Sequence, residues 1–249
     1  MRNIWGWVVG VVLVGGVVVS LVRLFGDDVP DELRRVRVTP PVAAPAEPAE
    51  QAAPKHDAAK ATPAPTPAAT FGEVKIGDDD YVLGKPDAPV TIVEYASLTC
   101  SHCARFHGDV LPVLTAEFIA AGKVRLVYRD FPLDRLALMA AMVARCAGRE
   151  RYFGFIDAFF AEQQGWARSA DPVAALAGIA RLGAMAQSDF DVCLKDKVVA
   201  DKVLKQRLEG EKLFNIDSTP TLIVNGAKYS GGLTLDQIKA VMRLLLSKP

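Results

Sequence analysis

The sequence has no excess of either charge and few residues of the reactive kinds. Its 249 residues include 29 basic and 29 acidic side chains, so the formal net charge is zero, and there are only four cysteines and three histidines. A chain with balanced charge has no electrostatic basis for binding a nucleic-acid backbone, so no nucleic-acid partner is expected. The sequence contains no internal repeat, so a repeat architecture is not expected. His56 has no second potential ligand close in sequence, and we expect no metal site around it.

Proline is scarce over most of the chain and concentrated in one stretch. Half of the sixteen prolines lie between Pro40 and Pro67, where alanine is the other main residue and Glu, Lys and Thr are scattered. Such a segment cannot bury enough apolar area to offset the entropy cost of ordering it. We therefore expect residues 26–70 to be a disordered linker, stiffened by proline, that reaches at most on the order of 100 Å at ~3.1 Å per residue.

One long hydrophobic run precedes the linker. Ile4 to Val22 carries no charged residue, and its nineteen residues are close to the ~20 needed to cross a bilayer core. The run predicts a transmembrane helix, and residues 1–25 are expected to be an uncleaved anchor. A cleaved signal peptide is the alternative, although no small-residue cleavage site follows closely. More basic residues follow the run than precede it, and by the positive-inside rule this would keep the following domain in the cytoplasm. Export is therefore inferred from the chemistry described below.

The globular part is expected to span residues 71–249. Val90–Ser97 is apolar on both faces, as expected for a central strand that is covered on both sides. A helix follows and ends near Gly122, and Pro112 is expected to kink it. Val124–Asp130 predicts a second strand, which should run parallel to the first because a helix intervenes.

The region of about residues 134–214 contains no convincing strand and predicts a helical insertion. Asp171-Pro172 is an N-cap with proline at the first helical position, in a helix that ends at Gly183. Ser188-x-x-Asp191 predicts a capping box before a further helix. The other expected elements are an edge strand at 74–76, a turn at 77–80, a type I′ hairpin of Thr221–Val224 and Ala227–Ser230 around Asn225-Gly226, and a final helix capped by Thr234 and ending at Leu246.

Cys100 and Cys103 are two thiols three positions apart at the start of a helix, directly after an apolar strand. This layout is typical of a redox pair rather than of a core feature. At the first turn of a helix the backbone N–H groups are unpaired and the macrodipole is positive, so a thiolate on Cys100 is stabilised. A lowered thiol pKa makes that sulfur both a nucleophile and a good leaving group.

The order of strand, Cys-x-x-Cys helix, strand, helical insertion, hairpin and helix resembles the thioredoxin fold with a helical insertion, as in the DsbA-like thiol:disulfide oxidoreductases. The resemblance covers about residue 80 to the C-terminus. Cys100-Ser101-His102-Cys103 matches the redox motif of that family, although serine stands where proline is common. Thr219-Pro220 matches its cis-proline loop, and Glu94 stands where members carry a buried acid near the second cysteine. Phe159 to Trp166 is similar to its insertion helix.

The resemblance implies a role for each of these residues. A substrate thiolate would attack Cys100 to form a mixed disulfide, and Cys103 would leave. His102 would donate a hydrogen bond to the Cys100 thiolate and, when protonated, neutralise it. Glu94 is expected to have a raised pKa and to transfer a proton to Cys103, with a hydrogen-bonded structural acid as the alternative. A cis Thr219-Pro220 bond would leave the Thr219 backbone free to pair with an extended substrate.

The expected protein is thus a dithiol oxidase of the periplasm, anchored in the inner membrane, that introduces disulfides into exported proteins without a cofactor. A membrane partner of the DsbB type would re-oxidise it. A disulfide isomerase or reductase of the same fold is an alternative, although the linker leaves no room for a dimerisation domain. A tethered metal-binding module using Cys100, Cys103 and His107 is another, although no fourth ligand is evident and His107 is more simply an ordinary exposed or core histidine.

Cys146 and Cys193 lie in separate predicted helices of the insertion. In an exported protein we expect them to form a structural disulfide, because neither has a neighbouring Cys-x-x partner. Its closed loop of about 48 residues would stabilise the fold by ~4 kcal/mol in the chain-entropy model. Two buried free thiols are the alternative.

Overall fold

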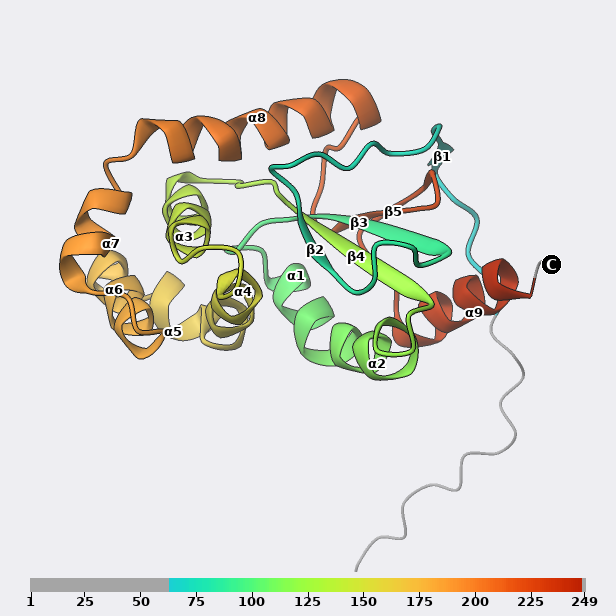
Figure 1. The fold of residues 1–249 in the computed structure, drawn as a ribbon, viewed down its shortest axis with the longest axis horizontal. Coiled ribbons are helices and arrows are strands. Elements are labelled where there is room, and N and C mark those ends of the chain that lie inside the picture. The colour runs from blue at the N-terminus through green and yellow to red at the C-terminus, as the bar shows by residue number, and fades with distance from the viewer. Residues whose placement is uncertain (1–62, 248–249) are drawn as a thin grey trace, which may run out of the picture. The chain divides into compact units, whose positions relative to one another are not determined.

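The structure is a computed structural model that describes residues 63–247 (Figure 1). Its centre is a six-stranded sheet in the order β1-β6-β5-β3-β4-β2, in which β3 and β4 are parallel and the other pairs are antiparallel. The strands are β1 (Ala69–Thr70), β2 (Tyr81–Leu83), β3 (Val90–Ala96), β4 (Val124–Asp130), β5 (Thr221–Val224) and β6 (Ala227–Ser230). The sheet therefore begins at Ala69, slightly before the expected start of the globular part.

The two central strands and the hairpin confirm the predictions made from their apolar sequences. β3 pairs with β4 in parallel from Val90 opposite Val124 to Ala96 opposite Asp130, and nearly every residue of both strands is buried. The β5–β6 hairpin turns at Asn225 and Gly226, whose φ angles of 44° and 86° are those that a type I′ turn requires. Because β3 lies between β4 and β5, its carboxyl end lies in the interior of the sheet and not at an edge.

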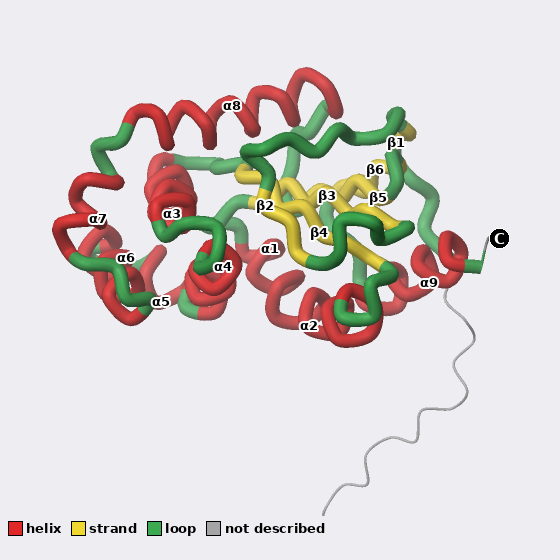
Figure 2. Tube along the Cα trace, in the orientation of Figure 1, coloured by secondary structure: helices red, strands yellow, loops and turns green. Residues whose placement is uncertain are grey.

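Helices cover both faces of this sheet (Figures 1 and 2). On one face Ile92 and Leu126 pack against Leu114 and Met242, which come from the helical run after β3 and from the last helix. On the other face Tyr95 packs in a cluster with the chain around residues 74–76 and the end of α8. The helices are α1 (Ser101–Arg105), α2 (Leu111–Leu114), α3 (Arg135–Cys146), α4 (Tyr152–Ala161), α5 (Gln163–Ala167), α6 (Pro172–Leu182), α7 (Gln187–Cys193), α8 (Lys197–Phe214) and α9 (Leu235–Leu246).

The helical run after β3 departs from regular α geometry on both sides of Pro112, as the kink predicted there suggests. The π-helical segments η2 (Phe106–Val110) and η3 (Thr115–Ile119) flank α2, which contains the proline. Proline has no N–H to donate and its ring crowds the preceding turn, so the helix widens around it. The run then ends before Gly122, whose φ of 70° suits glycine.

The helical insertion, α3 to α8, lies between β4 and β5 in the chain and confirms the prediction of an all-helical region. Its helices surround a core of large fully buried side chains, including Tyr152, Phe159, Trp166 and Phe190. The predicted cap at Asp171 is also confirmed, because its carboxylate accepts a hydrogen bond from the Ala174 N–H. No helix within residues 63–247 is both long and apolar enough to cross a membrane. The predicted transmembrane helix lies outside the described residues, as does most of the predicted linker.

Two expectations about individual elements were wrong. Residues 74–76 form no strand; the edge of the sheet next to β4 is β2, and Val74 instead packs its side chain into the core over the sheet. Ser188 and Asp191 form no capping box, because α7 already begins at Gln187. The cap that starts the following helix is Asp196, which is better placed because a turn separates α7 from α8.

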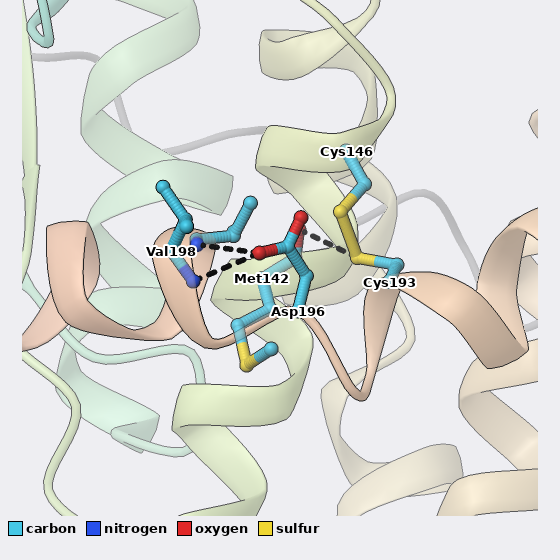
Figure 3. The surroundings of a disulfide bond; sticks show 6 residues. Met142, Cys146, Cys193, Asp196 and Val198 are labelled. Carbon is cyan, nitrogen blue, oxygen red and sulfur yellow. Dashed lines mark hydrogen bonds between the residues drawn. A yellow bond between two sulfur atoms is a disulfide. The ribbon is translucent and has the colours of Figure 1, made fainter.

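The predicted disulfide between Cys146 and Cys193 is present in the structure and joins the end of α3 to the end of α7 (Figure 3). The Cys193 sulfur also lies 3.2 Å from the Met142 carbonyl oxygen. That contact is not a hydrogen bond, since a disulfide sulfur carries no proton. Next to it, Asp196 accepts hydrogen bonds from the first N–H groups of α8, including that of Val198 at 2.8 Å. The disulfide therefore fixes the corner of the insertion from which α8 starts.

Buried polar side chains connect the insertion to the sheet. Arg145 of α3 donates to Asp130 at the end of β4 (2.6 Å) and to Gln206 of α8 (2.7 Å). Gln206 in turn donates to Asp80 (3.1 Å), which accepts two further hydrogen bonds from Arg129 of β4. All five residues are buried. Each buried charge thus has an opposite partner, which offsets much of its desolvation cost.

Candidate active site

Cys100 and Cys103 stand at the start of α1, a short loop beyond the carboxyl end of β3. Cys100 is the N-cap residue with an extended backbone, and its carbonyl accepts the hydrogen bond of the Ala104 N–H. Cys100 is partly exposed, whereas Cys103 is completely buried, and both are free thiols. The structure thus shows the reduced form, with one sulfur accessible to a partner and the other screened from it.

The loop before β5 lies against Cys100, as predicted from Thr219-Pro220. The Thr219-Pro220 peptide bond is cis, and the Cys100 thiol donates a hydrogen bond to the Thr219 carbonyl oxygen at 3.3 Å. The Thr219 hydroxyl is buried and has no hydrogen-bond partner. Residues separated by more than a hundred positions in the chain therefore meet at the reactive sulfur.

The surroundings of the two sulfurs move their pKa values in opposite directions. The pKa of Cys100 is lowered to about 5, mainly because the Cys103 thiol donates a hydrogen bond to its thiolate, with further help from the N–H groups of Cys103 and His102. Burial raises the pKa of Cys103 far above its ordinary value, and the Cys100 sulfur and the Glu94 charge raise it further. At neutral pH the reduced site therefore holds one thiolate, on Cys100, and one thiol, on Cys103.

His102 contributes through its backbone rather than through the contact predicted for its ring. The imidazole is exposed, and its Nδ1 accepts a hydrogen bond from the Arg105 guanidinium at 2.8 Å. The His102 N–H is one of the groups that lower the pKa of Cys100. The His102 imidazole thus contacts Arg105 on the surface of the helix. Its predicted action on the Cys100 thiolate stays a prediction.

Glu94 is buried beneath the cysteines, where His107 is its direct partner. The His107 Nε2 lies 3.2 and 3.0 Å from the two carboxylate oxygens of Glu94. Burial is the largest single effect and lowers the pKa of His107, but the charges of Glu94 and Asp157 and their hydrogen bonds together outweigh it and raise that pKa to about 9. The pair is therefore an imidazolium and a carboxylate at neutral pH. Glu94 is thus a buried and hydrogen-bonded acid, and its predicted proton transfer to Cys103 stays a prediction.

The arrangement of His107 does not support the metal-binding alternative. Its ring faces Glu94 instead of joining Cys100 and Cys103 as a third ligand. In the part of the chain that the structure describes, no three His, Cys, Asp or Glu side chains are placed to hold a metal ion together. His107 is thus a buried core histidine, which is one of the two positions favoured from the sequence, and its ring pairs with Glu94.

Gln163 is a residue of the site that its position in the sequence does not reveal. It begins α5 in the insertion, is buried, and donates hydrogen bonds from Nε2 to the carbonyl oxygens of Leu98 (2.8 Å) and Cys100 (3.0 Å). These carbonyls belong to the loop that leads from β3 to α1. Gln163 stands between two exposed polar residues, Glu162 and Gln164, so its sequence neighbours give no signal that it is buried or makes this contact.

Comparison with known proteins gives the same class of site. A family model described as Thioredoxin matches residues 77–243. The crystal structure of alpha-DsbA1 from Wolbachia pipientis is 33% identical, with a TM-score of 0.64, and the match covers 68% of this chain and 92% of that one. BdbD from Bacillus subtilis, in its oxidised form, is 25% identical with a TM-score of 0.65, over 72% of this chain and 99% of that one.

The first curated relatives that the chain matches are also protein-disulfide oxidoreductases. A protein-disulfide oxidoreductase of Rickettsia prowazekii is 34% identical over 174 residues, which make up 69% of this chain and 63% of the relative. The chain thus spans about three fifths of the length of the first curated relatives that it matches. The fold and the family model define a thioredoxin-type domain. More narrowly, the chain belongs to the DsbA-like disulfide oxidoreductases of the thioredoxin fold.

Proposed function

We propose that this protein is a dithiol oxidase that introduces disulfides into exported proteins through Cys100 and Cys103. The observation that carries this proposal is the pKa of Cys100, about 5, at a helix start opposite a cis-proline loop. A stabilised Cys100 thiolate favours the reduced form of the protein. A couple whose reduced form is stabilised is a strong oxidant of other dithiols.

The reaction begins with the Cys100–Cys103 disulfide. A substrate thiolate attacks the Cys100 sulfur, a new bond forms between the two sulfurs, and the Cys100–Cys103 bond breaks. Cys103 leaves as a thiolate and takes up a proton, because burial disfavours its charged form. A second substrate thiolate then attacks the substrate sulfur of the mixed disulfide, and Cys100 leaves as a thiolate. Two electrons have passed from the substrate to the protein.

The cis-proline loop supports a role in holding the substrate. The Thr219 carbonyl lies within hydrogen-bond distance of the Cys100 sulfur, so a chain attached to that sulfur would lie beside the Thr219 backbone. An extended segment can pair with such an exposed backbone edge, and this mode of recognition reads little of the side-chain sequence. It suits an enzyme that accepts many unfolded proteins.

The rest of the chain supports a place outside the cytoplasm. The apolar run Ile4–Val22 would anchor the protein in the inner membrane, and residues 26–70 would be a spacer that lets the domain of residues 71–249 reach its substrates. The disulfide between Cys146 and Cys193 suits an oxidising compartment. A DsbB-type membrane partner would accept the two electrons and restore the active disulfide.

The test is to measure the reduction potential of the couple and the rate at which the oxidised protein oxidises a reduced dithiol peptide. A potential well above the thioredoxin value of about −270 mV, with rapid oxidation of the peptide, is expected. Cys100→Ser should abolish oxidation, and Cys103→Ser should accumulate the mixed disulfide. A thioredoxin-like potential would instead indicate a reductase. A periplasmic reporter fused after residue 70 tests the orientation, and an inactive reporter would contradict the assigned compartment.

A further inference from the structure

A shallow groove of about 190 Å³ lies in the helical insertion, between one face of α3 and the turn that joins α7 to α8. We call it the α3 groove. The α3 face contributes Arg135, Leu138, Met139 and Met142, whose spacing of three and four residues places them on one side of the helix. The opposite wall is formed by the turn and the first residues of α8: Leu194, Lys195, Asp196, Lys197 and Ala200. The groove has room for one large apolar side chain.

The α3 groove is joined to the active site through Asp134, the residue that caps α3. Asp134 accepts a hydrogen bond from the Thr99 hydroxyl at 2.6 Å, and Thr99 immediately precedes Cys100. Arg135, the first lining residue of α3, follows Asp134 in the chain. From Arg135 to Met142 the lining extends about 10 Å at ~1.5 Å per residue, which an extended chain covers with roughly three residues. A polypeptide attached to Cys100 is therefore able to reach the groove within a few residues of its own cysteine.

The walls of the α3 groove carry free positive charge. Arg135, Lys195 and Lys197 are exposed, and none of them forms an ion pair within the part of the chain that the structure describes. The one acid among the lining residues is Asp196, whose carboxylate accepts hydrogen bonds from the first N–H groups of α8. Asp201, the next acid of α8, lies outside the lining. Further along α8, three basic residues do pair with carboxylates: Lys202, Lys205 and Arg207.

Exposed leucines continue the apolar part of this surface. Leu133, two residues before the start of α3, is 48% exposed, and Leu204, one turn of α8 beyond Ala200, is 38% exposed. The two segments are in contact here, because Arg207 of α8 donates a hydrogen bond to the Pro132 carbonyl oxygen. Single exposed leucines are ordinary on a protein surface, but these two border a groove that combines apolar side chains with unpaired cations. Such a surface is complementary to a segment that is both apolar and acidic.

We propose that the α3 groove binds a segment of the substrate polypeptide in which an apolar side chain stands between acidic residues. The proposal rests on the proposed function and names a class of substrate for it. While the substrate cysteine is joined to Cys100, the segment a few residues away places its apolar side chain against Leu138 and Met139. Its carboxylates then lie near the three free cations. Opposite charges of this kind speed association and select between partners more than they add affinity.

The test compares how fast the oxidised full chain oxidises two dithiol peptides. The peptides share one sequence around their cysteines and differ in a tail about four residues away, which is Glu-Leu-Glu in one and Gln-Leu-Gln in the other. At low ionic strength the acidic peptide should have a kcat/KM at least about threefold higher. The ratio should approach one in about 0.5 M salt, which screens the charges. Serine in place of the tail leucine should lower kcat/KM about threefold, because the apolar contact is lost.

A triple variant removes the free cations of the groove, all of which are exposed: Arg135→Gln, Lys195→Gln and Lys197→Gln. It should oxidise the acidic peptide no faster than the uncharged one, and its rate with the uncharged peptide should not change. A matched control variant removes three exposed cations from α9 and from the loops before β3 and β4, away from the insertion (Figure 1): Lys85→Gln, Lys123→Gln and Arg243→Gln. The control variant should keep the preference for the acidic peptide.

The outcomes separate this proposal from the proposed function. Equal kcat/KM values for the acidic and uncharged peptides, or an unchanged preference in the groove variant, would overturn the substrate site alone. A groove that serves a second copy of the chain or an anionic lipid surface would also show no peptide preference. The groove variant would then change its oligomeric state or its binding to phosphatidylglycerol vesicles, and either result would overturn the proposal. A protein that oxidises neither peptide would overturn the proposed function itself.

Discussion

Replacing Cys100 by serine in the reduced protein should remove a part of its stability that depends on pH. The surroundings of Cys100 lower its pKa from an ordinary 9.0 to about 5, so the folded state favours the thiolate. This contribution is fully present above the unfolded pKa, near 9, and is lost as the pH falls toward 5. At ~1.36 kcal/mol per pKa unit the whole shift corresponds to ~5 kcal/mol, and solvent screening of the partly exposed sulfur reduces this to roughly half.

The assay is urea unfolding of the reduced protein and of Cys100→Ser at three pH values. The stability difference between them should change by ~2–3 kcal/mol between about pH 9 and about pH 5, with roughly half of the change above neutral pH. The ultraviolet absorbance of the thiolate should disappear with a midpoint well below the unfolded value, shifted in the direction of pH 5. A midpoint near ~8.5, together with a stability difference independent of pH, would refute the reasoning. The oxidised protein is the control, since it has no thiolate to titrate.

Three further outcomes can be measured. Changing both Cys146 and Cys193 to serine should lower the free energy of unfolding by ~4 kcal/mol without changing the pKa of the active-site thiol, since the loop that they close is long and remote; an equally stable variant would contradict this. Gln163→Ala should cost ~1–3 kcal/mol in urea unfolding because two carbonyls lose their donor, whereas the exposed neighbour Gln164→Ala should cost almost nothing. Equal effects would exclude a stabilising role for the Gln163 hydrogen bonds. Gly226→Ala should destabilise the hairpin, because φ is 86° there and a Cβ would collide with a backbone carbonyl; unchanged thermal unfolding would show that the turn can rearrange.

The elements that local sequence patterns specify were predicted correctly. β3 and β4 follow from their apolar composition, and the turn at Asn225-Gly226 follows from the backbone angles that those residues adopt easily. The position of Cys100 at a helix start follows from the end of the preceding strand. The cis bond before Pro220, in contrast, was predicted from the family resemblance, because a single X-Pro pair in isolation favours the trans form.

The parts that were missed depend on residues that are distant in the chain. His107 was expected to be an exposed or core histidine, and it is buried in the core. Its pairing with Glu94 was missed, because nothing near it in sequence shows that Glu94 comes within hydrogen-bond distance of its ring. Gln163 reaches Cys100 only once the insertion has folded over the sheet. The start of α8 was misplaced for a local reason, since Ser188 and Asp196 are both acceptable caps by sequence, and Ser188 lies inside α7.

The buried network of Arg145, Asp130 and Gln206 has a consequence for motion. A hinge movement of the insertion away from the sheet would leave these groups unpaired in a dry interior, which is costly for each. The sheet and the insertion should therefore open as a single cooperative unit, with their amide protons exchanging at one common, slow rate. The part of the molecule left free to adjust its shape is then the rim around the Thr219 loop, while the body behind it behaves as one rigid piece.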